Sequence, residues 1–130
     1  MLVRDVQEKD KSQLFSLYRE FAIESQQAPV DLLDIGKNWL VICEDKNKVI
    51  GYGAASRISY CAEDYIQAEH IYVTPAYRGT KAAHMIYRSF RKWSKLQARP
   101  IIMLSEPTEL NMWLRKGYKP LRYMLVKELK

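Results

Sequence analysis

The sequence has no apolar run approaching the ~20 residues that a membrane-spanning helix needs, and its first ten residues lack the apolar segment of a signal peptide. It has little cysteine: Cys43 and Cys61 have neither the spacing of a metal site nor that of a disulfide framework. We therefore expect a cytoplasmic protein that makes no membrane contact and holds no metal, with both cysteines as free thiols.

The composition excludes a disordered or fibrous chain, because 48% of the residues are apolar, 28% are charged and 12% are aromatic. A chain of 130 residues falls in the size range of one domain and can bury a substantial core. We therefore expect a single globular domain over residues 1–130.

Acidic residues are absent between Glu69 and Glu106, although the whole chain has a net charge of +6. The same interval holds seven basic residues, namely Arg78, Lys81, Arg88, Arg91, Lys92, Lys95 and Arg99. This asymmetry favours an anionic ligand such as a polyphosphate. The alternative is an ordinary solvated basic face of a helix.

The segment Glu69–Trp93 predicts a strand that leads through a short Pro- and Gly-containing loop into a helix starting near Thr80. Apolar residues then recur every three or four positions, which gives one stripe that can face a sheet: Ala82, Ile86, Phe90 and Trp93. The first turn of such a helix presents free N–H groups and the positive end of the helix dipole. With Arg78 and Lys81 beside it, this turn predicts a phosphate site.

The run I-Y-V-T-P-A-Y-R-G-T-K-A-A, which begins at Ile71, resembles motif A of the GNAT family of N-acetyltransferases. In that family the loop and helix hold the pyrophosphate of acetyl-CoA through a pattern of Arg or Gln, two residues, Gly, one residue, and Gly or Ala. Arg78 and Ala83 match its first and last positions, whereas Lys81 stands where the family usually has Gly. The resemblance implies acetyl-CoA as cosubstrate and the following cofactor-binding residues: Ile71, Tyr72, Val73, Arg78, Gly79, Thr80, Lys81, Ala82 and Ala83.

The order of predicted elements agrees with that resemblance. Alternation and helical periodicity predict strands over 2–6, 39–44, 49–60, 65–73, 100–105 and 121–129, and helices over 10–25, 80–93 and 110–117. Asp10 and Gln13 have the spacing of a capping box, and residues 30–36 predict a short second helix or a partly ordered loop. The predicted fold class is α/β of the α+β type, the acyl-CoA N-acyltransferase fold with a mixed, mostly antiparallel sheet flanked by helices (β-α-(α)-β-β-β-α-β-α-β).

Two residues of the central strand could take a proton from an amine acceptor, which must be neutral to attack. Glu69 stands where many GNAT members carry an acidic residue for this role, and a structural ion pair is its alternative. His70, whose ordinary pKa already suits a base, should point to the opposite face by strand alternation. In the family the main chain of the central strand, here at Ile71 and Val73, contacts the pantetheine arm beside a bulge.

The residue that would reprotonate departing CoA is less defined. GNAT members often use a Tyr in a Y-x-x-x-G-F pattern, and the corresponding run here is W-L-R-K-G-Y, which places Trp113 at the Tyr position. An indole does not donate a proton usefully. Tyr118, Tyr123 and Tyr72 are the substitutes, with Tyr118 as the first candidate.

Three functions follow from these observations. The first is an acetyl-CoA-dependent N-acetyltransferase acting on the primary amine of a small molecule or protein. The second is a degenerate GNAT member that binds CoA or a protein partner without turnover, and the third, least favoured, is a basic nucleic-acid-binding domain. The oligomeric state stays open, with a homodimer as one option.

Overall fold

The structure is a computed structural model that describes residues 1–25, 39–104, 107–122 and 125–129. One sheet has the strand order β1-β2-β3-β4-β5, with bounds Leu2–Asp5, Trp39–Asp45, Lys48–Tyr60, Glu63–Val73 and Ile101–Ile102. The first three pairs of neighbours are antiparallel, and β4 and β5 are parallel. The predicted mixed and mostly antiparallel sheet is confirmed.

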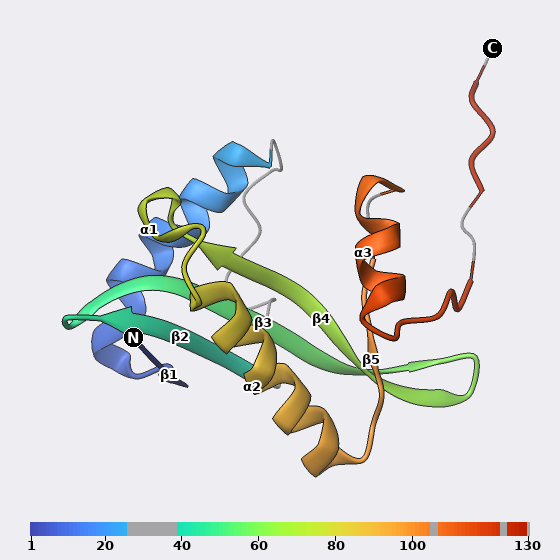
Figure 1. The fold of residues 1–130 in the computed structure, drawn as a ribbon, viewed down its shortest axis with the longest axis horizontal. Coiled ribbons are helices and arrows are strands. Elements are labelled where there is room, and N and C mark those ends of the chain that lie inside the picture. Colours follow the sequence, from blue (N-terminus) through green and yellow to red (C-terminus); the bar gives the residue numbers. More distant parts are fainter. Residues whose placement is uncertain (26–38, 105–106, 123–124, 130) are drawn as a thin grey trace.

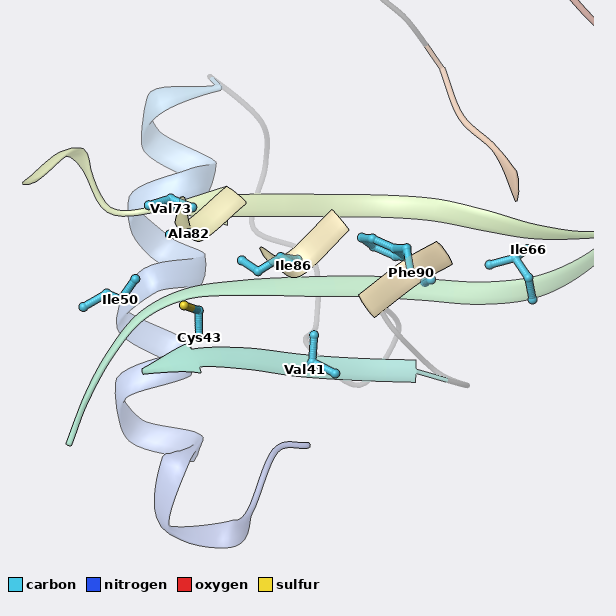
Figure 2. Close-up of a cluster of buried hydrophobic side chains, with 9 residues drawn as sticks. Val41, Cys43, Ile50, Ile66, Val73, Ala82, Ile86 and Phe90 are labelled. Atoms are coloured by element: carbon cyan, nitrogen blue, oxygen red, sulfur yellow. The ribbon is translucent and has the colours of Figure 1, made fainter. Parts of the chain in front are cut away.

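Two helices cover opposite faces of this sheet (Figure 1). Helix α1, Lys11–Glu24, packs Leu14, Leu17 and Tyr18 into one core cluster. Helix α2, Ala82–Gln97, packs the predicted apolar stripe into the other. Ala82, Ile86 and Phe90 are fully buried, and Figure 2 shows them in one cluster with strand residues such as Val41 and Ile66.

Close contact between α2 and the sheet depends on a glycine in β3. A Cβ built on Gly53 would lie 2.5 Å from Cγ2 of Ile86 and 3.5 Å from the Phe90 ring. Real Cβ atoms do not approach that closely, so any larger residue would push the helix away. This packing fixes where the first turn of α2 lies relative to β4.

The capping box predicted from Asp10 and Gln13 is wrong. Helix α1 follows a 3-10 turn, Glu8–Asp10, and the Asp10 carboxylate accepts hydrogen bonds from Arg4 at 2.8 and 2.9 Å and from the Gln7 amide at 2.8 Å. The Gln13 side chain instead accepts from the Val49 amide of β3 at 3.0 Å. Both side chains therefore join α1 to neighbouring elements and do not cap it.

The predicted strand over 121–129 is also wrong in the part that the structure describes. After a 3-10 turn at Pro107–Glu109 and helix α3 at Leu110–Arg115, residues 119–122 and 125–129 form no strand. They lead away from the sheet (Figure 1), and Leu125 is 90% exposed. The alternating pattern finds no partner here because β5 pairs with β4 over only two residues and a lone strand is not stable in water.

The remaining predicted elements agree with the structure within a few residues, except for the short helix or loop predicted over 30–36, which lies outside the described residues. In the described chain no helix is long and apolar enough to cross a membrane. Cys43 is buried in the core, and Cys61 is exposed in the turn between β3 and β4.

Candidate active site

An extra residue in β4 opens the sheet beside its neighbour β5. His70 pairs with Ala54 of β3 and Ala68 pairs with Ala55, so Glu69 is inserted between them as a bulge. Strand β4 pairs with β5 only at Ile66 and Gln67. From the bulge to Val73, β4 therefore has an edge that β5 does not cover.

The backbone of β4 presents hydrogen-bonding groups to this edge. The Thr74 amide donates to the Ile50 carbonyl of β3 at 2.9 Å, and successive residues of a strand point their backbone groups to alternate sides. The groups of Ile71 and Val73 therefore point away from β3. The Val73 carbonyl accepts a hydrogen bond there from Nε of Arg78 at 3.1 Å, which supports this direction.

A cavity of about 410 Å³ follows the same edge. Its lining comes from α1, β4 and the start of α2, namely Phe21, Glu24, Ser25, Ile71, Tyr72, Val73, Arg78 and Ala83. Five of the nine residues predicted to bind the cofactor therefore lie around one cavity, although they come from different elements.

The loop after β4 shapes the start of α2. Gly79 has a φ of +80°, a left-handed conformation that favours glycine. The Thr80 hydroxyl accepts from the Ala82 amide at 3.3 Å, and the first helical bond runs from Met85 to the carbonyl of Lys81 at 2.9 Å. The helix thus begins at Ala82, two residues later than predicted.

This geometry assigns different positions to the residues of the predicted phosphate turn. Helical bonding begins at the Met85 amide, so the Ala83 and His84 amides belong to the first turn of α2, whose N–H groups point along the axis toward any ligand at its end. The Ala82 side chain is buried in the core, and Lys81 is exposed. The backbone amides of Ala83 and His84 are therefore the hydrogen-bond donors that the first turn of α2 can offer to an anion.

Arg78, the main predicted phosphate ligand, reaches across to α1. Its NH2 atom lies 2.6 Å from Oε2 of Glu24, and its guanidinium carbon lies 5.5 Å from the centre of the Tyr72 ring. The hydrogen bond from Arg78 lowers the pKa of Glu24 below its usual range. Sequence reasoning missed this partner because Glu24 is 54 positions away.

A second cavity, of about 660 Å³, lies between α2 and the segment that follows α3. It is lined by His84, Tyr87, Arg88, Arg91, Ser94, Lys95, Ile101, Lys116, Gly117, Tyr118 and Lys119. The five Arg and Lys side chains, with no acidic residue among the described residues of the lining, make it a basic cavity. The basic residues of α2 are evident in the sequence. Lys116 and Lys119 were not predicted to join them, because only their position around Gly117 indicates a shared site.

Glu69 and His70 lie on the same side of the sheet, so the prediction that strand alternation separates them is wrong. Ser56 donates a hydrogen bond to Glu69, and alternation along β3 places Ser56 on the α1 side, as it does Ala54. His70 packs against Phe21 of α1, with ring centres 4.4 Å apart. The bulge causes this arrangement, because one extra residue shifts the alternation of β4.

The His70 imidazole is half-buried among aromatic rings. Its Nδ1 lies 3.3 Å from the Tyr52 hydroxyl, and burial lowers the pKa of His70, while the charge of Glu69 opposes that shift. The ring is therefore neutral near pH 7. Of the two predicted bases, Glu69 is the one that lies at the bulge itself.

Tyr118, the predicted acid, lies apart from these two residues. It lines the basic cavity and shares a hydrogen bond with the Tyr87 hydroxyl, whereas the lining of the two cavities includes neither Glu69 nor His70. Burial, with a contribution from Tyr87, raises the pKa of Tyr118. Trp113 packs beside it, with ring centres 5.4 Å apart.

Comparison with solved structures places this fold in a known class. Similar structures include a putative acetyl transferase from Pyrococcus furiosus (TM-score 0.78, 16% identity, 98% of this chain and 99% of that one) and a predicted acetyltransferase with acetyl-CoA from Clostridium acetobutylicum (0.72, 18%, 98% and 95%). Glucosamine-6-phosphate N-acetyltransferase from Arabidopsis thaliana is also similar (0.68, 13%, 99% and 98%). The five-stranded sheet with its flanking helices is therefore the acyl-CoA N-acyltransferase fold.

The sequence identifies the family within that class. A model of the Acetyltransferase (GNAT) family matches residues 4–119, so the chain belongs to this family. Among curated proteins, no match to the sequence was found.

Proposed function

We propose that this protein is an acetyl-CoA-dependent N-acetyltransferase that acts on a primary amine of a small molecule or protein. The observation that carries the proposal is the cavity at the uncovered edge of β4, which ends at the first turn of α2. The free backbone groups of the strand edge and the amides of the helical turn fit a flexible arm that contains amide groups and ends in a polyphosphate. The GNAT family and a similar structure that contains acetyl-CoA support the assignment.

In this proposal each part of the cosubstrate has its own contacts. The pantetheine arm lies along β4 and pairs with the backbone of Ile71 and Val73. The pyrophosphate lies at the Ala83 and His84 amides, with Arg78 in reach. The phosphorylated adenosine end lies toward the basic cavity, whose lining begins at His84 and therefore adjoins the same helical turn.

The chemistry requires a neutral amine and a leaving thiolate. Glu69 accepts a proton from the acceptor amine directly or through water, and the amine nitrogen bonds to the thioester carbonyl carbon as the C–S bond breaks. The CoA thiolate then takes a proton from solvent, because Tyr118 lines the basic cavity toward the adenosine end of the proposed cosubstrate. A thiol with an ordinary pKa near 8.5 leaves without much help, so Trp113 at the usual Tyr position is compatible with turnover.

Calorimetry and turnover together test the proposal. Acetyl-CoA should bind the purified protein, and release of the free CoA thiol should accelerate when primary amines from a panel are added. If acetyl-CoA does not bind and no amine accelerates release of the thiol, the proposal is wrong. Binding without turnover on any amine would favour a CoA-binding member without catalysis, the alternative motivated by Lys81 and Trp113 at the usual Gly and Tyr positions.

A further inference from the structure

Arg78 is held at three points by residues that line the cavity beside β4. Glu24 accepts from its NH2 atom at 2.6 Å, the Val73 carbonyl accepts from its Nε atom at 3.1 Å, and the ring of Tyr72 lies beneath its guanidinium. The same Glu24 oxygen lies 3.4 Å from the Tyr72 hydroxyl. The Glu24 carboxylate therefore lies in the wall of the cavity where the pyrophosphate of the proposed cosubstrate is expected to bind.

A carboxylate is not needed at this position for the helix itself. Glu24 is the last residue of α1, where the dipole disfavours a negative charge, and its side chain is 49% exposed. Its contacts lie on the cavity side, with Arg78 and Tyr72. Replacement by the neutral and similarly shaped Gln should leave α1 intact.

We propose that Glu24 limits the affinity of the protein for the pyrophosphate of CoA by competing for Arg78. This inference depends on the proposed function, because it assumes that a diphosphate binds beside Arg78. While the ion pair is formed, the Arg78 charge is balanced by Glu24. A diphosphate must therefore share or displace the carboxylate before it can pair with Arg78. Glu24 thus favours release of CoA after transfer.

The test compares two ligands on matched variants. Glu24→Gln should tighten binding of acetyl-CoA by about fivefold or more in calorimetry, since Arg78 then loses its carboxylate partner and its full charge is available to the diphosphate. S-acetylpantetheine, which has the same thioester arm and no phosphate, should bind both proteins equally. Glu8→Gln is the control. Glu8 lies just before α1, carries the same charge as Glu24 and makes an exposed ion pair with Lys11.

A second pair of variants tests whether Glu24 acts through Arg78. Arg78→Ala should weaken acetyl-CoA binding by about tenfold, and adding Glu24→Gln to it should then change the affinity by less than about twofold. Thermal unfolding of each variant verifies that it is folded.

The outcomes separate this inference from the proposed function. Unchanged or weaker acetyl-CoA binding by Glu24→Gln, with binding by the unmodified protein intact, would overturn the competition alone. Equal tightening for S-acetylpantetheine, or full tightening in the Arg78→Ala background, would also overturn it. Failure of the unmodified protein to bind acetyl-CoA would overturn both proposals.

Discussion

Glu69 owes its position to a single added residue in β4. The bulge brings it onto the same face as His70 and within hydrogen-bonding distance of Ser56. The sequence shows that an acidic residue precedes the motif that begins at Ile71. Strand alternation alone, however, places Glu69 and His70 on opposite faces of the sheet, which is wrong. The shift is a property of the pairing with β3, which local sequence does not contain.

The role of Glu69 is tested by removing its charge. Glu69→Gln should lower kcat by about 10²-fold, because a proton acceptor acts in the transition state. Acetyl-CoA affinity should stay nearly unchanged. Glu63→Gln on the same strand is the control and should keep normal turnover. A normal rate for Glu69→Gln on a verified amine would transfer the role to His70 or solvent.

Asp10 is the buried carboxylate of the amino-terminal region. Hydrogen bonds from Arg4, which also contacts Glu44 at 3.0 Å, lower the pKa of Asp10 below 3.8. A group whose folded pKa is depressed stabilises the protein above its unfolded pKa and loses that contribution as the pH falls toward the folded value. Asp10 therefore stabilises the fold at neutral pH and ceases to do so in acid.

Asp10→Asn should lower the Tm at pH 7 by about 5–10 °C, because it leaves Arg4 without its main charged partner. The difference from the unmodified protein should shrink as the pH falls below about 3.8, because the Asp10 carboxylate of the unfolded chain takes up a proton there, whereas the folded one, with its lowered pKa, does so only at lower pH. Asp5→Asn, at an exposed neighbouring position, is the control. A difference in Tm that does not change with pH would contradict the proposed contribution of this charge.

At the scale of elements, the strands and helices with strong periodicity were predictable. The stripe of α2 is buried as its spacing predicts, and the paired strands β2, β3 and β4 lie within two residues of their predicted bounds. The last strand was not predictable, because alternation shows only that a segment can pair. Whether it pairs depends on an edge elsewhere in the fold, and β5 presents a very short one.

The contact between α2 and β3 gives a stability prediction. Gly53→Ala should lower the free energy of unfolding by about 1–3 kcal/mol in urea denaturation, because its Cβ would overlap with Cγ2 of Ile86. Ile86→Ala removes that atom at its own cost of about 2–5 kcal/mol. The double variant should therefore lose less than the sum of the two single losses. Simple additivity would show that this overlap is not the cause.

Across the whole molecule, positive charge concentrates on one side of α2 and on the segment after α3. The net charge of +6 alone does not choose between a phosphorylated cofactor and nucleic acid. The structure adds that five of these side chains line one cavity, which adjoins the first turn of α2, namely Arg88, Arg91, Lys95, Lys116 and Lys119. A confined basic cavity suits a compact polyphosphate better than a long nucleic-acid backbone, which would need an extended basic surface.

Salt dependence distinguishes these two uses of the charge. Acetyl-CoA binding should weaken as NaCl is raised from about 0.05 to about 0.5 M, because salt screens exposed charges. Arg91→Ala, in the lining of the basic cavity, should weaken binding and flatten that dependence. Lys48→Ala, at an exposed position at the start of β3, removes the same charge and should change neither the affinity nor its salt dependence.

A fluorescent single-stranded RNA serves as the competing probe. If the RNA binds in a salt-dependent manner and acetyl-CoA fails to displace it, the cavity is not the site of the cofactor phosphates, and nucleic-acid binding becomes the better account of the basic face.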